Sequence, residues 1–200
     1  YAYAETDIVV DIYGYYIASS GGTGTPGQDG ADGADGQDAV SPARVIWVAE
    51  SGGDFPSLSE AMASIPDNNT AATPYVIKIA PGTYTETSNV AMKNYVDVEG
   101  SGQGITTITC ALCSGSDTAD SVSGSTISID EVNTEIRQIT IENTGSPFGY
   151  AIHSNQNTDT TWSVSIADVT ATATGATTRA TGIDAKKSTL KLRNVTASAQ

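Results

Sequence analysis

Apolar and polar residues alternate in short runs along most of the chain after Val45, and Gly, Pro or Asn separates one run from the next. Clear runs occupy residues 75–80, 95–102 and 105–109, where Val, Ile, Tyr and Thr are frequent. A period of two with β-branched and aromatic residues is typical of β-strands that bury one face. The pattern therefore predicts an all-β domain built from short strands.

One segment has the spacing of a helix instead, at residues 57–65. Ser57 is in the N-cap position, Glu60 follows three residues later as in a capping box, and Pro66 stops the helix. One apolar stripe joins Leu58, Ala61, Met62 and Ile65. We therefore expect one short helix near residues 57–65.

The second half of the chain repeats a strand pattern at residues 135–141, 165–171 and 191–197. Ile136 and Ile166 are 30 residues apart, and Leu192 follows after 26 more. Intervening strands at residues 150–153 and 181–184 are offset by 31 residues. Such repeats predict stacked coils whose inward side chains are buried against the neighbouring coils. After Gln200 we expect either further chain or another subunit to cover the last coil.

Residues 1–20 form a separate segment that carries a single predicted strand. Its apolar set is Ile8, Val10, Ile12, Tyr13, Tyr15 and Ile17. The segment resembles the strand that ends many bacterial surface modules. Because a lone apolar strand exposes unpaired backbone groups, we expect it to pair with β-structure of another subunit.

Residues 21–43 form a Gly-x-Asp linker in which Gly recurs at every third position from Gly21 to Gly36, as in collagen. With one Pro and four Asp in its six Gly triplets, the segment is either a flexible acidic linker or an ordered extended or triple-helical one. The Asp spacing does not match an EF-hand loop. No cofactor is predicted, and calcium stays open only as a counter-ion between Asp side chains.

The chain is acidic, with 9 basic and 23 acidic residues and a net charge of −14. Residues 1–43 have no Lys or Arg and carry −7 of that charge, which places a domain boundary near residues 40–44. An acidic chain excludes nucleic acid and anionic membranes as partners. No apolar run approaches the roughly 20 residues that span a bilayer. We expect an extracellular or cell-surface protein of bacterial origin.

Three stretches after residue 44 resemble the pectin-methylesterase branch of the pectin-lyase-like superfamily. They are residues 48–66 (VAESGGDFPSLSEAMASIP), 75–86 (YVIKIAPGTYTE) and 96–109 (VDVEGSGQGITTIT). The resemblance implies that residues 44–200 form a right-handed parallel β-helix whose N-terminal end is capped by the short helix.

In that family two Asp residues act as acid/base and nucleophile, Gln side chains form the oxyanion site, and an Arg holds the nucleophile. Where the Gln motif should follow Gly145, residues 148–152 read FGYAI, and residues 164–170 match neither Asp motif. The resemblance therefore carries over no catalytic residue. Asp168 and Asp184 lie on successive coils and could form a carboxylate pair, but we interpret them as surface residues at strand ends. His153, the single His, is interpreted as a surface or turn residue.

Cys110 and Cys113 form a CxxC motif after a predicted strand. One such pair cannot supply the four ligands of structural zinc. In an exported protein we expect a small local disulfide, with free buried thiols as the alternative.

Taken as a sequence, the chain is expected to be a non-enzymatic extracellular structural or adhesive protein. Its expected partners are further copies of itself, in a head-to-tail filament rather than a collagen-type trimer, and a polysaccharide or cell-surface ligand is a further candidate. Two alternatives are kept for the function. One is a polysaccharide-active, pectin-type esterase or lyase, and the other is a trimeric phage-type tail fibre or host-binding spike.

Overall fold

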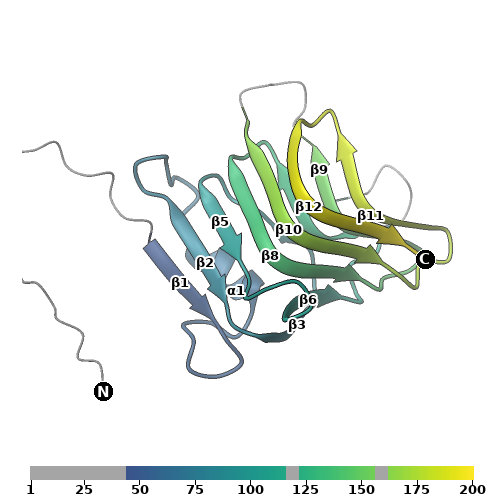
Figure 1. The fold of residues 1–200 in the computed structure, drawn as a ribbon, viewed down its shortest axis with the longest axis horizontal. Helices are drawn as coiled ribbons and strands as arrows, with labels where there is room; N and C mark the ends of the chain where they lie inside the picture. Colours follow the sequence, from purple (N-terminus) through teal and green to yellow (C-terminus); the bar gives the residue numbers. More distant parts are fainter. Residues whose placement is uncertain (1–43, 116–121, 156–161) are drawn as a thin grey trace, which may run out of the picture. The chain divides into compact units, whose positions relative to one another are not determined.

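The computed structural model describes residues 44–115, 122–155 and 162–200, which wind into a right-handed parallel β-helix (Figure 1). The predicted all-β solenoid is therefore confirmed. The predicted N-terminal strand (residues 1–20) and Gly-x-Asp linker (residues 21–43) lie outside the described residues. Among the residues described, no helix is long and apolar enough to cross a bilayer.

One short helix and twelve strands make up the described part of the chain. In order they are β1 (Arg44–Val48), α1 (Leu58–Ser64), β2 (Tyr75–Ile79), β3 (Gly82–Glu86), β4 (Val90–Ala91), β5 (Val96–Glu99), β6 (Thr106–Cys110), β7 (Ser125–Asp130), β8 (Thr134–Asn143), β9 (Phe148–Asn155), β10 (Val164–Ala173), β11 (Arg179–Lys186) and β12 (Leu190–Ala199).

The strands form two parallel sheets. The larger sheet has the order β1-β2-β5-β8-β10-β12, with β3 paired to β6 and β6 to β8, and the smaller has the order β11-β9-β7-β4. Figure 1 shows the larger sheet stepping from β1 at one end to β12 at the other. The repeats found in the sequence are in register, because Ile166 pairs with Ile136 on one side and Leu192 on the other. The same holds in the smaller sheet for Ile152 and Ile183.

The core consists of aliphatic columns that run from coil to coil. In the larger sheet one column joins Ile77, Val98, Ile136, Ile166 and Leu192. The first four are fully buried, and Leu192 on the last strand is 54% exposed. Along each strand, every second side chain points into this core, and the side chains between them point to the outer face. Each strand therefore contributes polar side chains to the surface.

A corner within the longest strands is formed by residues in the left-handed region. Gln138, Asp168 and Asn194 have φ values of 55°, 56° and 51°. Each lies between two register pairs of β8, β10 and β12, so the three strands bend at the same level. Asn194 Nδ2 donates to Asp168 Oδ1 at 2.9 Å, which links two of these corners.

Helix α1 packs against β1, β2, β3 and β4, at the end of the β-helix that begins with β1. Its Leu58, Ala61 and Met62 are buried, and Ser57 Oγ accepts a hydrogen bond from the Glu60 backbone at 3.3 Å. The predicted capping helix and its N-cap are thus confirmed.

Cys110 and Cys113 are joined by a disulfide at the end of β6. Asn143, fully buried at the end of β8, lies beside it and donates Nδ2 to the carbonyls of Cys113 and Gly124, both at 3.1 Å. Its Oδ1 accepts from the Gly145 backbone at 2.9 Å. One buried amide therefore holds the disulfide turn and the turn after β8 together.

Candidate functional site

Two rows of side chains cross the outer face of the larger sheet. The sequence of β5, Val96-Asp97-Val98-Glu99, alternates so that both carboxylates point outward while both Val side chains are buried. In β8 the same alternation places Glu135 and Arg137 outside and Ile136 inside. The pairing of the strands defines the two rows. The first row consists of Asp97, Glu135, Ser165 and Lys191, and the second row consists of Lys78, Glu99, Arg137, Ala167 and Arg193.

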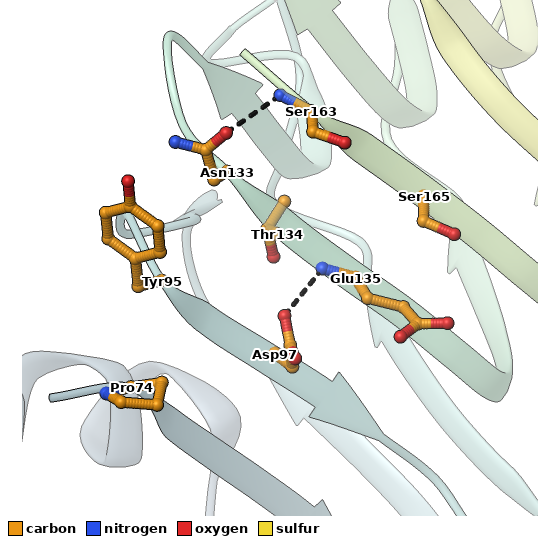
Figure 2. A pocket seen from close by; sticks show the side chains of 8 residues that line it. All are labelled: Pro74, Tyr95, Asp97, Asn133, Thr134, Glu135, Ser163 and Ser165. Atoms are coloured by element: carbon orange, nitrogen blue, oxygen red, sulfur yellow. Dashed lines mark hydrogen bonds between the residues drawn. The ribbon is translucent and has the colours of Figure 1, made fainter. Parts of the chain in front are cut away.

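A groove of about 410 Å³ lies over the first row, where β2, β5, β8 and β10 begin. Its lining residues are Pro74, Tyr95, Asp97, Asn133, Thr134, Glu135, Ser163 and Ser165. Figure 2 shows them on neighbouring strands and in the turns before those strands, with Tyr95 and Pro74 on one side of the carboxylates and the two Ser residues on the other. The groove thus crosses the strands and offers hydroxyl, amide and carboxylate groups to a polar ligand.

The turns before the strands shape one rim of the groove. The Asn133 backbone donates to Asn94 Oδ1, and the Ser163 backbone donates to Asn133 Oδ1, both at 2.9 Å. Stacked Asn side chains therefore join successive coils next to Tyr95, as the upper dashed line in Figure 2 shows. This ladder fixes the rim without using the groove carboxylates.

Asp97 and Glu135 are the central pair of the groove. The Glu135 backbone donates to Asp97 Oδ1 at 2.8 Å. Burial raises the pKa of the Asp97 carboxyl above its usual value. The hydrogen bond from the Glu135 backbone opposes that rise in pKa, and the Glu135 charge adds to it. Asp97 thus combines a raised pKa with a second carboxylate beside it in a polar groove. Such a pair of carboxyl groups is typical of an acid/base site.

An ion-pair network in the second row lies next to Asp97 and Glu135 and contacts Glu135. Glu99 accepts from Lys78 Nζ at 2.9 Å and from Arg137 at 2.6 Å, and Arg137 also pairs with Glu135 at 2.9 Å. The hydrogen bond from Lys78, aided by Arg137, lowers the pKa of Glu99 below its usual value. Arg137 therefore connects the network to Glu135 and holds that side chain beside the groove.

Asp168 and Asp184 do not form a carboxylate pair. Asp168 lies at the corner of β10, where it pairs with Arg193 at 2.8 Å, while Asp184 belongs to β11 of the other sheet. The interpretation of His153 as a surface or turn residue is wrong. It is 2% exposed within β9, and its Nδ1 lies 3.1 Å from Asp184 Oδ2. Register across β9 and β11 makes His153 and Asp184 direct neighbours, at the same 31-residue offset that the sequence gives for these two strands.

Sequence reasoning missed Asp97, Glu135 and Tyr95. The available signal was the outward position of both carboxylates in strictly alternating strands. Their proximity depends on the pairing of β5 with β8, whose hydrogen bond from Glu135 to Asp97 joins residues 38 positions apart. No cluster of His, Cys, Asp and Glu able to hold a metal occurs in the described ranges. The Asp residues considered for calcium lie outside those ranges.

Comparison with known proteins gives a family and a fold. A sequence model of the pectinesterase family matches residues 44–165, from β1 into β10. Pectin methylesterase from carrot is similar with a TM-score of 0.51 and 22% identity, covering 80% of this chain and 53% of that chain. Pectin methylesterase PemA from Erwinia chrysanthemi gives a TM-score of 0.39 and 18% identity, covering 65% and 49%. The chain thus spans about half the length of these solved relatives. No curated protein sequence matches significantly.

These findings correct the expected function. The carrot structure supports the right-handed β-helix, and the matched family is one of esterases. The expectation of a non-enzymatic structural or adhesive protein is therefore wrong, and the pectin-type alternative is favoured. The expectation rested in part on motifs missing from residues 148–152 and 164–170. On a β-helix, however, outward side chains of any coil can meet in a groove, as Asp97 and Glu135 do.

Proposed function

Because the chain belongs to the pectinesterase family, we propose that it hydrolyses ester groups of a pectin-type polysaccharide outside the cell. The observation that carries the proposal is the family match over residues 44–165, which includes every residue that lines the groove. The location is supported by the Cys110–Cys113 disulfide, since disulfides persist in oxidising compartments.

The groove suits an extended, hydroxyl-rich polymer. Its lining residues come from four neighbouring strands and the turns before them, so it crosses the sheet as a site for an extended polymer would. Ser163, Ser165 and Asn133 offer hydrogen bonds to sugar hydroxyls. Tyr95 adds a partly buried aromatic ring at one end, next to Pro74. These groups match the mixture of apolar faces and hydroxyl edges of a sugar chain.

The two carboxyl groups supply the chemistry that ester hydrolysis needs. Glu135 takes a proton from a water molecule as its oxygen attacks the ester carbonyl, and Asp97, whose raised pKa favours the protonated form, gives a proton to the departing alcohol. A new bond forms between water oxygen and carbonyl carbon, the ester C–O bond breaks, and the products are methanol and a carboxylic acid, which releases its proton to solvent. Neither residue occupies a family motif position, so the assignment comes from the groove alone.

Methanol release from methyl-esterified pectin by the purified chain tests the proposal. We expect Asp97→Asn and Glu135→Gln each to reduce the rate by about 100-fold or more, the usual contribution of a positioned acid or base. Asn at position 97 can still accept the hydrogen bond from the Glu135 backbone, so the fold is preserved. Because Asp97 acts in its protonated form, activity should fall as pH rises through its raised pKa.

Asp168→Asn is the matched control, since it removes a carboxylate from the same sheet outside the groove. We expect it to leave methanol release unchanged. Absence of methanol release from the wild-type chain, or a wild-type rate in Asp97→Asn, would contradict the proposal.

A further inference from the structure

Two Asn residues of the chain begin the sequence Asn-x-Thr, which is the acceptor motif for N-linked glycans in secreted proteins. One motif starts at Asn68 and reads Asn-Asn-Thr, and the other starts at Asn194 and reads Asn-Val-Thr. The Cys110–Cys113 disulfide supports an oxidising compartment, as such a modification requires. The structure distinguishes the two motifs, because their Asn side chains have different surroundings.

Asn68 is an accessible acceptor. It lies in a turn between α1 and β2, where Asp67 and Thr70 are exposed as well. Its side chain makes no hydrogen bond with another residue that the structure describes. Both the acceptor amide of Asn68 and the residue that completes the motif, Thr70, are therefore at the surface.

Asn194 is the less suitable acceptor. It lies at the corner of β12, where its Nδ2 donates to Asp168 Oδ1 at 2.9 Å and its carbonyl accepts from Gln103 Nε2 at 3.2 Å. Nδ2 is the atom to which an N-linked glycan is attached. A glycan at this position would take the place of the contact with Asp168, and the two coils would lose one of their links.

A polar pocket adjoins Asn68 at the beginning of β1 and β2. It has a volume of about 290 Å³. Its walls are Arg44, Pro66, Asn68, Asn69, Thr70, Thr73 and Tyr75. The whole motif that starts at Asn68 is thus part of the wall. A sugar attached to Asn68 is next to this pocket from the moment it is attached.

The pocket contains a buried acceptor that lacks a donor. Asn69 is 8% exposed, and its Nδ2 donates to the Asn94 carbonyl, while its Oδ1 has no hydrogen-bond partner in the described structure. Leaving such an atom unpaired is costly, and a native structure normally satisfies it with water or a ligand. The pocket therefore matches a ligand that brings an N–H or O–H donor.

Arg44 supplies donors to the same pocket. Its Nη1 donates to the Tyr75 hydroxyl at 2.8 Å, and its guanidinium forms no ion pair with the residues that the structure describes. A guanidinium has five N–H donors, so most of them are left for a ligand. The pocket thus offers donors from Arg44 and an acceptor from Asn69, which together match a group that has both a carbonyl oxygen and an N–H.

We propose that Asn68 carries an N-linked glycan whose first sugar, an N-acetylated hexosamine, lies in this pocket. The acetamide group of such a sugar has one N–H donor and one carbonyl acceptor. Asn69 Oδ1 accepts from the sugar, and Arg44 donates to it. Asn194 stays unmodified.

The modification is a glycosyl transfer that an external transferase performs, with a lipid-pyrophosphate-linked oligosaccharide as the donor. Nδ2 of Asn68 forms a bond to C1 of the first sugar, and the bond between C1 and the pyrophosphate oxygen breaks. The lipid pyrophosphate leaves with the electron pair, and one amide proton passes to a base of the transferase. The chain itself contributes the acceptor and the pocket.

Secretion of the full chain from a eukaryotic cell, which supplies the transferase and the lipid-linked donor, tests the acceptor. Mass spectrometry of peptides after enzymatic removal of the glycan, which converts a glycosylated Asn to Asp, reports the occupancy of each motif. We expect Asn68 to be glycosylated and Asn194 to be unmodified. Thr70→Ala should abolish the modification, and Thr70→Ser should preserve it because the motif is kept. Asn194→Gln is the control and should leave the occupancy of Asn68 unchanged.

Thermal unfolding tests the position of the first sugar in the pocket. An endoglycosidase trims the glycan to one N-acetylhexosamine, and the trimmed chain is compared with the same chain made in a host without the transferase. We expect the single sugar to raise Tm by about 2–4 °C, the shift that one added hydrogen bond gives in a chain of this size. Asn69→Ala keeps the acceptor motif but removes the buried oxygen, so in this variant the sugar should not raise Tm.

An unmodified Asn68, or equal modification of Asn194, would overturn the assignment of the acceptor. No rise in Tm with the sugar, or an equal rise in the wild-type chain and in Asn69→Ala, would overturn the position of the sugar in the pocket. The comparison is made within each variant, so any stability that Asn69→Ala loses on its own does not enter the result. None of these measurements depends on methanol release, so they test the glycan independently of the proposed esterase.

Discussion

At the scale of single residues, Glu99 shows how one outward side chain connects three strands. Lys78 on β2 and Arg137 on β8 both bind its carboxylate on β5. These contacts lower its pKa, chiefly through the hydrogen bond from Lys78, so the folded state favours the ionised form. The resulting stabilisation is fully present above the usual pKa of Glu and is lost as pH falls through the lowered value.

Replacing Glu99 by Gln should therefore destabilise the protein at neutral pH only. We expect the free energy of unfolding at pH 7 to fall by about 1 kcal/mol, a modest value because the network is partly solvated. The difference from wild type should shrink as the pH falls through the lowered pKa of Glu99, because the carboxyl is then protonated in both states. Urea unfolding at pH 7 and at an acidic pH below that lowered pKa measures this.

Glu142→Gln serves as the comparison, because Glu142 forms no ion pair with the residues that the structure describes and is half-buried on the same strand as Arg137. It should change the free energy of unfolding by less than about 0.5 kcal/mol. An equal loss for Glu99→Gln at both pH values would mean that packing, not charge, accounts for the effect.

Residue-level chemistry was only partly predictable from the sequence. Alternation places Asp97, Glu99, Glu135 and Arg137 on the outer face, and the CxxC spacing suggests the disulfide that Cys110 and Cys113 form. Pairing between the unlike coils of the first half was not predictable, because the turns between their strands vary in length. The contact of Asp97 with Glu135 is the clearest case, since the two residues are 38 positions apart and no repeat in the sequence gives that offset.

At the scale of elements, helix α1 depends on two capping residues, one adjacent to the helix in the sequence and one far from it. Ser57 caps the helix locally, and this was predicted from the capping-box spacing. Glu86, at the end of β3 and 2% exposed, accepts from the backbone N–H groups of Leu58 at 2.9 Å and Ser59 at 3.4 Å. The second cap could not be read from the sequence, because it needs β3 to lie against the start of the helix.

Removing the Glu86 carboxylate leaves two helix N–H groups without partners in a buried position. We therefore expect Glu86→Ala to lower the free energy of unfolding by about 2–3 kcal/mol, more than an exposed cap would cost. Glu60→Ala, an exposed position in the same helical turn, should cost less than about 0.5 kcal/mol. Thermal and urea unfolding measure both, and equal costs would show that Glu86 is not a cap of α1.

At the scale of the whole β-helix, the sequence was most informative where one pattern repeats. The offsets between Ile136, Ile166 and Leu192 correspond to actual neighbours in register. The fold follows because each coil needs the same inward residues as the next. The groove has no such redundancy. Its lining side chains come from four strands and the turns before them and differ from one strand to the next, so no repeat in the sequence indicates it.

The column Ile77, Val98, Ile136, Ile166 and Leu192 predicts how stability is distributed along the β-helix. Ile136 is fully buried between two coils, whereas Leu192 is 54% exposed with a paired strand on one side. Ile136→Ala should lower the free energy of unfolding by about 2–5 kcal/mol, because a cavity opens inside the column. Leu192→Ala should cost about 1 kcal/mol or less, since little buried area is lost. Urea unfolding of both variants, with Ile136→Val as an intermediate step expected to cost about 1 kcal/mol, measures this gradient. Equal costs at the two positions would mean that the coils do not share one continuous core.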